Sequence, residues 1–204
     1  MRLYLASTSP ARLATLRAVG VEPVLLSSNL DEEAAVAASG PLSPTEMVLL
    51  LARLKAEGVV DPEIDGFILG GDSAFELDGV VYGKPHEPSI ARERWMLQRG
   101  RQGQLHSGHW LIDHRGGVLG EARGGVSSSF VRFADVSDEE IDAYVATGEP
   151  LKVAGAFTID SLGAPFISEV RGDPHAVVGL SVALLRSLLL EFGVAWPSLW
   201  NRGL

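Results

Sequence analysis

The chain has 204 residues, of which 46% are hydrophobic, and it contains no cysteine. This size is sufficient for a packed core, and the absence of cysteine excludes disulfides, thiolate catalysis and cysteine zinc sites. The formal net charge is −9, from 26 acidic and 17 basic residues, which argues against a nucleic-acid polymer as partner because such proteins present a basic face.

No apolar run in the sequence reaches the ~18 residues that a membrane-spanning helix needs. The first residues also lack the length and the cleavage pattern of a signal peptide. We therefore expect a cytoplasmic protein that does not associate with a membrane. Because no repeat or long linker interrupts the sequence, residues 1–204 are expected to form a single domain.

The first predicted elements are a strand over 2–6 and a helix that starts at Pro10. Ser9 is a good N-cap and Pro10 suits the first helical position. The free N–H groups of a helix start attract anions, Ser7 adds a hydroxyl, and Arg12 adds a permanent positive charge. A capped helix without any ligand explains the same residues, so this segment alone leaves both interpretations open.

Strands and helices alternate through the next part of the sequence, which predicts an α/β core. The expected elements are a strand over 23–27, an alanine-rich segment after 31–33 that is compatible with helix or loop, a helix from the capping box at 43–46 to Gly58, and a short strand over 67–69 that brings Asp72 to its C-terminal end.

The second half of the sequence predicts a hairpin at Asp78-Gly79 and then further strands. The expected elements are a helix over 88–98, strands over 106–112, 118–133, 154–159 and 164–170, a helix from the capping box at 137–140 to Gly148, and a leucine-rich helix that starts near Val177. The pattern predicts one α/β domain with a mixed twisted sheet flanked by helices and a cleft between two lobes.

Three charged residues are candidates for chemistry, and each also has a structural explanation. Asp72 follows glycines at a predicted strand end, where ligands gather in α/β sheets, and its carboxylate could bind a cation or accept a proton from water. Lys84 lies between Gly83 and Pro85, and Lys55 lies in the last turn of a helix. A turn aspartate, a solvated turn lysine and a lysine that favours the helix dipole explain the same positions.

Seven short motifs, in this order along nearly the whole chain, resemble those of the Maf family. They are 5–12 (LASTSPAR), 51–56 (LARLKA), 71–73 (GDS), 83–85 (GKP), 148–150 (GEP), 154–157 (AGAF) and 177–180 (VVGL). The resemblance implies a fold similar to that of the house-cleaning inosine triphosphatases. It also implies hydrolysis of nucleoside triphosphates to a nucleoside monophosphate and pyrophosphate, with a divalent metal such as Mg²⁺ or Mn²⁺.

The resemblance also implies roles for individual residues. Asp72 matches the proposed proton acceptor of the family, and Glu32 matches an acidic residue that helps to hold the metal together with Asp72. The positions that match the phosphate-binding residues are Ser7, Arg12, Lys55 and Lys84. A homodimer is compatible with this interpretation.

Three further positions match the places where members of the family differ in substrate choice. They are Ala11, Ser73 and Asp160. Residues at these positions fit neither the thymidine/uridine-type nor the 7-methylguanosine-type pattern. Asp160 favours a guanine-like base, because a carboxylate accepts hydrogen bonds from the adjacent N–H donors of guanine, whereas Ala11 offers no ring for stacking.

Two other functions compete with this hypothesis. A nucleotide-binding regulator of cell division or septum formation would need the basic residues but gains nothing from a carboxylate at Asp72. A hydrolase of sugar nucleotides or other phosphate esters would use a similar site and release a different product. Pyrophosphate release from a panel of triphosphates separates the three.

Overall fold

The structure is a computed structural model, and it describes residues 1–202. The chain divides into two compact units. Unit 1 comprises Met1–Asp72, Ser107–Ser127 and the C-terminal segment from Gly179 on, and unit 2 comprises Ser73–His106 and Ser128–Val178. That residues 1–204 form a single domain stays a prediction. Within residues 1–202, no helix has both the length and the apolar character required to cross a membrane.

Strands and α-helices alternate through the first part of the chain, as the sequence predicts. The strands are β1 Leu3–Ala6, β2 Val24–Leu26, β3 Gly66–Leu77, β4 Val80–Tyr82, β5 Gln102–His114, β6 Ala122–Phe133 and β7 Ile167–Arg171. The α-helices are α1 Pro10–Ala18, α2 Glu32–Ser39, α3 Pro44–Glu57, α4 Pro88–Gln98, α5 Asp138–Ala146, α6 Pro174–Val178 and α7 Val182–Glu191. Short 3₁₀ helices are η1 Arg115–Gly117, η2 Glu149–Lys152, η3 Ala154–Ala156, η4 Ala164–Phe166 and η5 Trp196–Leu199.

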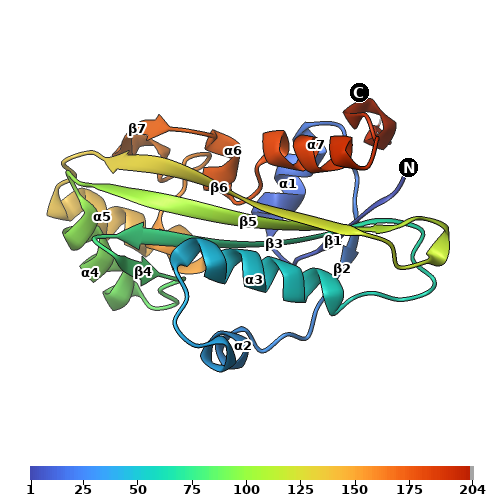
Figure 1. The fold of residues 1–204 in the computed structure, drawn as a ribbon. Helices are drawn as coiled ribbons and strands as arrows, with labels where there is room; N and C mark the ends of the chain where they lie inside the picture. Colours follow the sequence, from blue (N-terminus) through green and yellow to red (C-terminus); the bar gives the residue numbers. More distant parts are fainter. Residues whose placement is uncertain (203–204) are drawn as a thin grey trace. The chain divides into compact units, whose positions relative to one another are not determined.

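The sheet of unit 1 has the strand order β2-β1-β3-β5-β6, and β1 pairs parallel with both β2 and β3. Successive side chains of β1 point to opposite faces of this sheet. Leu3 and Leu5 pack in the same core cluster as Leu16 of α1 and residues of α7, whereas Tyr4 packs with residues of α3. Figure 1 shows this arrangement, with α1 and α7 on one side of the strands and α3 on the other.

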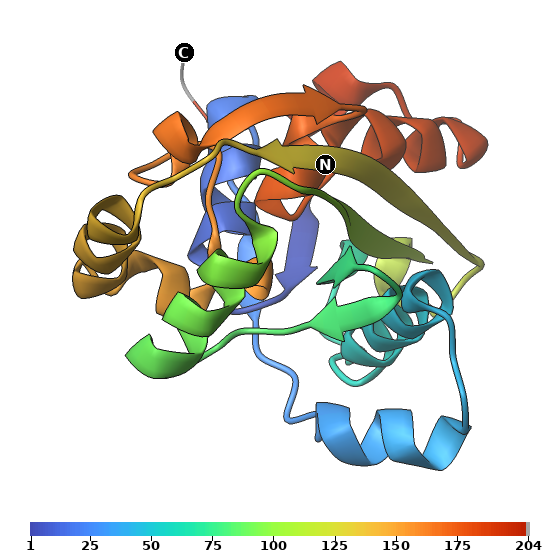
Figure 2. The ribbon, with the colours of Figure 1, turned by 90° about the vertical axis from the view of Figure 1, so that its left-hand side faces the viewer.

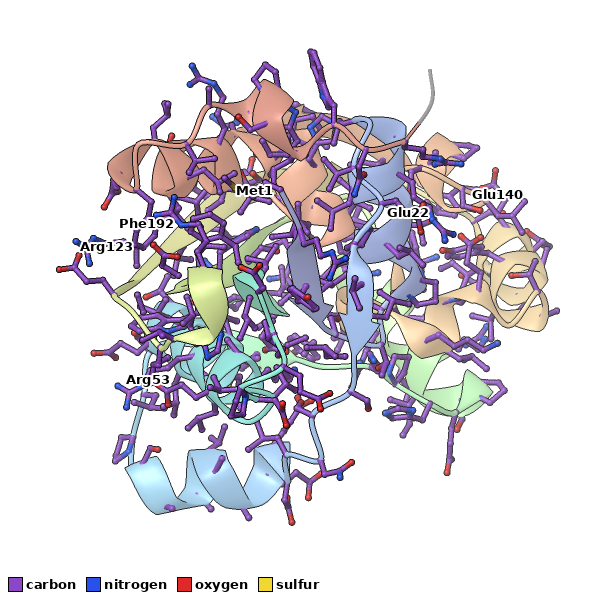
Figure 3. All side chains as sticks on the ribbon, turned by 90° about the vertical axis from the view of Figure 1, so that its right-hand side faces the viewer. Met1, Glu22, Arg53, Arg123, Glu140 and Phe192 are labelled. Atoms are coloured by element: carbon purple, nitrogen blue, oxygen red, sulfur yellow. The ribbon has the colours of Figure 1, made fainter. Side chains whose placement is uncertain are left out.

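Arginine side chains lie over aromatic rings on both sides of the sheet of unit 1. Figure 3 labels one such pair, in which the Arg123 guanidinium lies 5.4 Å from the ring centroid of Phe192, which follows α7. On the opposite side of the sheet, the guanidinium of Arg53 in α3 lies 5.8 Å from the centroid of Trp110. Phe192 also packs against Phe67, a fully buried ring in the core of the same unit, with the ring centroids 5.5 Å apart.

Helix α2 is the least embedded element of unit 1. Its N-cap Asp31 accepts a hydrogen bond from the backbone N–H of Ala34 at 3.0 Å, and none of its residues is buried. Figure 2 shows α2 at the edge of unit 1, connected by loops on both sides. The sequence is compatible with helix or loop for this segment, and the structure has a short helix with a side-chain cap.

The sheet of unit 2 has the order β4-β3-β5-β6-β7, and its β3–β4 hairpin turns at Asp78-Gly79 as predicted. Both turn residues have positive φ, 53° and 77°, which is the geometry that Asp-Gly pairs favour in tight hairpins. The core contains a cluster of aromatic side chains, in which Trp95 of α4 packs edge-on against Phe133 and Tyr144.

A single carboxylate organises the segment that follows α5 in unit 2. Glu149 accepts hydrogen bonds from the Tyr144 and Thr158 hydroxyls at 2.9 and 2.6 Å, and from the backbone N–H groups of Leu162 and Gly163. Burial alone would raise the pKa of Glu149. The hydrogen bonds, including one from Ser161, outweigh burial and lower it to about 2.

Two predictions about strands are wrong. The strand expected over 67–69 runs from Gly66 to Leu77, so Asp72 lies inside a strand and not at its C-terminal end. The strand expected over 154–159 does not form. The φ angles of Gly155 and Ala156, 71° and 60°, lie in the left-handed region and are incompatible with extended backbone, so the chain turns over 154–156.

Candidate active site

The start of α1 and the end of β1 place a buried arginine in unit 1. Ser9 caps α1 as predicted, because its side chain accepts a hydrogen bond from the backbone N–H of Arg12. The Arg12 side chain is only 8% exposed. Its Nε donates to the carbonyl oxygen of Gly179 at 2.8 Å, and its Nη1 donates to Ser7 Oγ at 3.0 Å.

Burial lowers the pKa of Arg12, and the negative charges of Asp72 and Glu32 oppose that shift. An arginine stays protonated in proteins, so its guanidinium is a fixed positive charge at the carboxyl end of β1.

A lysine of α3 connects two carboxylates in the same unit. Lys55 Nζ lies 2.7 Å from Asp72 Oδ1 and 2.9 Å from Glu32 Oε1. Lys55 and Asp72 are both buried, at 8% and 9% exposure, whereas the Glu32 side chain is half exposed. Lys55 therefore does more than favour the dipole of its own helix, because its ammonium group is shared by two acidic side chains from different elements.

Two glycines in β3 allow α3 and the Arg12 side chain to approach the strand closely. A Cβ atom at Gly70 would collide with the carbonyl oxygen of Ala52 and approach Ala56, so α3 lies directly on the strand at this point. A Cβ atom at Gly71 would lie 3.2 Å from Arg12 Nε. Side chains alternate along a strand, so Asp72 shares the face of Gly70, which is the face that α3 covers.

The register of the parallel strands explains why the charges meet here. Ala6 is the last residue of β1 and pairs with Gly70 of β3, so Asp72 projects just beyond the carboxyl end of β1. Ligands of α/β sheets bind at the carboxyl ends of parallel strands. Two cations and two carboxylates lie at this edge, and such groups are chemically able to bind phosphate oxygens and to accept a proton from water, respectively.

Five of the predicted site residues are thus brought together in unit 1. They are Ser7, Arg12, Glu32, Lys55 and Asp72. Ala11 also lies in unit 1, in the first turn of α1. Sequence reasoning assigned no role to the Gly179 carbonyl, which lies in the quoted motif 177–180 and holds the Arg12 guanidinium.

The other three predicted residues belong to unit 2. Ser73 follows Asp72 directly in β3, so the two side chains point to opposite faces of the strand. Lys84 is exposed and follows β4. Asp160 is exposed and lies in the segment that Glu149 organises.

Comparison with known proteins agrees with the family that the sequence motifs suggest. Residues 2–192 match the model of the family described as Maf-like protein. The chain is 65% identical to a nucleoside triphosphate pyrophosphatase of Leifsonia xyli subsp. xyli, over 99% of this chain and 98% of the relative. It is 51% identical to a protein of the same description from Salinispora tropica, over 100% of this chain and 89% of the relative. The chain belongs to the Maf family.

Among solved structures, the chain is similar to the Staphylococcus aureus Ham1 protein. The TM-score is 0.46 at 13% sequence identity, and the match covers 95% of this chain and 100% of that one.

Proposed function

We propose that this chain is a nucleoside triphosphate pyrophosphatase that hydrolyses its substrate to a nucleoside monophosphate and pyrophosphate with a divalent metal. The observation that carries the proposal is the set of charged side chains in unit 1, in which buried Lys55 is shared by Asp72 and Glu32, and Arg12 lies at the same strand edge. The descriptions of the relatives support the same activity.

The donor set fits a divalent cation that substrate phosphates help to hold. Mg²⁺ is commonly bound by one or two carboxylates together with phosphate oxygens, and Glu32 and Asp72 supply two carboxylates to a single cation, the Lys55 ammonium. Within residues 1–202, no three His, Asp or Glu side chains gather into a metal site, so substrate phosphates would have to supply the remaining ligands. Bound at Glu32 and Asp72, the metal would neutralise charge that develops on the phosphates.

The side chains of the set have distinct roles in this mechanism. Arg12 and Ser7 bind phosphate oxygens through the guanidinium and the hydroxyl. Of the two carboxylate oxygens of Asp72, only Oδ1 has an ion-pair or hydrogen-bond partner within residues 1–202. Oδ2 is therefore available to accept a proton from water. That water attacks the α-phosphorus, the bond to the bridging oxygen breaks, and pyrophosphate leaves.

The charge of the set suits this reaction. Arg12 and Lys55 contribute two positive charges, and Glu32 and Asp72 contribute two negative ones. A bound divalent metal therefore makes the site positive, although the whole chain carries −9. Two unit charges ~4 Å apart interact by ~4 kcal/mol at an effective dielectric of ~20. The attraction of a polyanionic ligand to the site therefore outweighs its repulsion by the acidic surface, which is more distant and screened by solvent.

The roles of four residues rest on the resemblance to the family. Lys84 is proposed to bind phosphate oxygens, and Ala11, Ser73 and Asp160 to influence the choice of base, with Asp160 favouring a guanine-like base. Conversion to a monophosphate withdraws a triphosphate from polymerases, and this chemistry suits a role in clearing the nucleotide pool. The cytoplasmic location and the homodimer stay predictions.

The test is product analysis with a panel of nucleoside triphosphates, with and without Mg²⁺ or Mn²⁺. We expect equimolar monophosphate and pyrophosphate, and none of either after chelation of the metal. Inorganic phosphate with a diphosphate would show a different reaction. Tight nucleotide binding without turnover would favour the regulator.

A further inference from the structure

His109 is a buried titratable group that the mechanism does not use. It lies in the part of β5 that belongs to unit 1 and is 1% exposed. A Cβ atom at Gly108 would collide with the backbone of Val48 in α3, so Gly108 faces α3 and His109 faces the opposite side of the sheet. Leu111, two residues further on, packs on that opposite side in the core cluster of α1 and α7. The His109 ring therefore lies in the layer that carries Arg12.

The hydrogen bonds of His109 define its tautomer. Nδ1 lies 3.1 Å from the carbonyl oxygen of Ser107, which only accepts, so Nδ1 carries the proton. Nε2 then has a lone pair, and it accepts a hydrogen bond from the backbone N–H of Ser181 at 2.9 Å. Neutral His109 thus supplies an acceptor to a backbone group that is buried in unit 1.

The backbone that His109 holds is the turn that contacts Arg12. Ser181 is the N-cap of α7, and its hydroxyl accepts from the N–H of Leu184 at 3.0 Å. Leu180, before it, is 1% exposed in the core cluster. Gly179 has a φ of 118°, a value that favours glycine, and its carbonyl oxygen accepts from Arg12 Nε at 2.8 Å.

We propose that His109 is a positioning residue for Arg12, because its bond to Ser181 fixes the turn whose Gly179 carbonyl holds the guanidinium. The inference rests on the proposed function only in assigning Arg12 to substrate phosphates. Arginine binds phosphate through a planar fork of donors, so the orientation of its guanidinium matters as well as its charge. A residue of β5 and the N-cap of α7 thereby set that orientation.

The primary readout is the Nε–H group of Arg12 in ¹⁵N-edited NMR spectra, identified by its loss in Arg12→Lys. His109→Leu removes the acceptor at similar size, and His109→Asn keeps a polar side chain that is too short to reach Ser181. His109→Gln places an amide oxygen near the position of Nε2. We expect hydrogen exchange at Arg12 Nε to accelerate at least tenfold in His109→Leu and His109→Asn, and to return toward the parent rate in His109→Gln.

Kinetics of nucleoside triphosphate hydrolysis give the second readout. KM should rise about tenfold in His109→Leu and His109→Asn, the change that ~1.4 kcal/mol of lost binding gives, while kcat stays within about threefold. His109→Gln should recover most of the parent KM. A parent protein without pyrophosphatase activity would refute the proposed function, and the exchange measurement would still decide the role of His109.

His114 offers a matched control in the same unit. It is 2% exposed, and its Nδ1 donates to the carbonyl oxygen of Ile64 at 2.8 Å. His114→Leu should lower the melting temperature as His109→Leu does, with no change in Arg12 exchange or in KM. The proposal is overturned if His109→Leu and His109→Asn both leave Arg12 exchange at the parent rate, or if His114→Leu has the same effects.

Discussion

Replacing Asp72 by asparagine separates the chemical role of this carboxylate from its role in the ion pair with Lys55. The two side chains keep nearly the same volume, and the negative charge is lost. Breaking a buried ion pair by removing one partner costs ~3–5 kcal/mol. Lys55 keeps Glu32 at 2.9 Å after the substitution, so we expect a smaller loss of stability, ~1–3 kcal/mol, which a domain of ordinary stability tolerates.

Turnover should fall much further than stability. A positioned general base contributes a factor of ~10²–10⁴, so pyrophosphate release by Asp72→Asn should be lower by that factor at saturating substrate and metal. The assay is single-substrate pyrophosphate release, run beside thermal unfolding followed by circular dichroism. Asparagine cannot accept the proton from water, so raising the pH should not restore the rate.

Asp113→Asn supplies the matched control for this experiment. Asp113 also pairs with a cation in unit 1, Arg115 at 2.6 Å, but it lies at the C-terminal end of β5 and not at the strand edge of the site. Its replacement should leave turnover at the parent level. If a folded Asp72→Asn protein turns over within a few-fold of the parent, Asp72 is not the proton acceptor and the mechanism is wrong.

Three further outcomes follow from the same contacts. Lys55→Met removes the ammonium that Glu32 and Asp72 share, so Mn²⁺ binding without nucleotide should tighten about tenfold, as measured by electron paramagnetic resonance. Unchanged or weaker binding would contradict the idea that the metal and the Lys55 ammonium bind the same two carboxylates. Gly70→Ala forces a Cβ atom into the backbone of α3, which should cost ~1–3 kcal/mol or more in denaturant unfolding and lower turnover with it; full stability would show that α3 does not rest on β3. The folded pKa of Glu149, about 2, lies below its ordinary value of 4.5, so its stabilisation is present above pH ~4.5 and is lost as the pH falls toward 2. Melting temperatures should therefore fall more steeply from pH 6 to 2 for the parent than for Glu149→Gln. Parallel curves would show that ionised Glu149 does not stabilise the fold.

The features that were predictable from the sequence depend on local chemistry. Ser9, Ser43 and Ser137 each cap the helix that they were expected to start, because a cap needs only the residues of the first turn. The Asp78-Gly79 hairpin is correct for the same reason. Each of these signals spans a few neighbouring residues and owes little to the rest of the chain.

The features that were not predictable depend on contacts between distant segments. The length of β3 is set by pairing with β1, β4 and β5, so a break expected after residue 69 does not occur. The contact of Lys55 with Asp72 depends on how closely α3 approaches β3. The adjacent glycines at 70 and 71 are the sequence signal for that close approach, because a residue without a side chain lets a helix lie directly on the strand.

The exposed position of α2 has a practical consequence. Since the chain has no cysteine, a single thiol introduced on the outer surface of this helix would be a unique attachment point for a dye or a spin label. The label would sit within two turns of Glu32 without entering any packed interior, so it could report how that acidic side chain responds to each cation or nucleotide added.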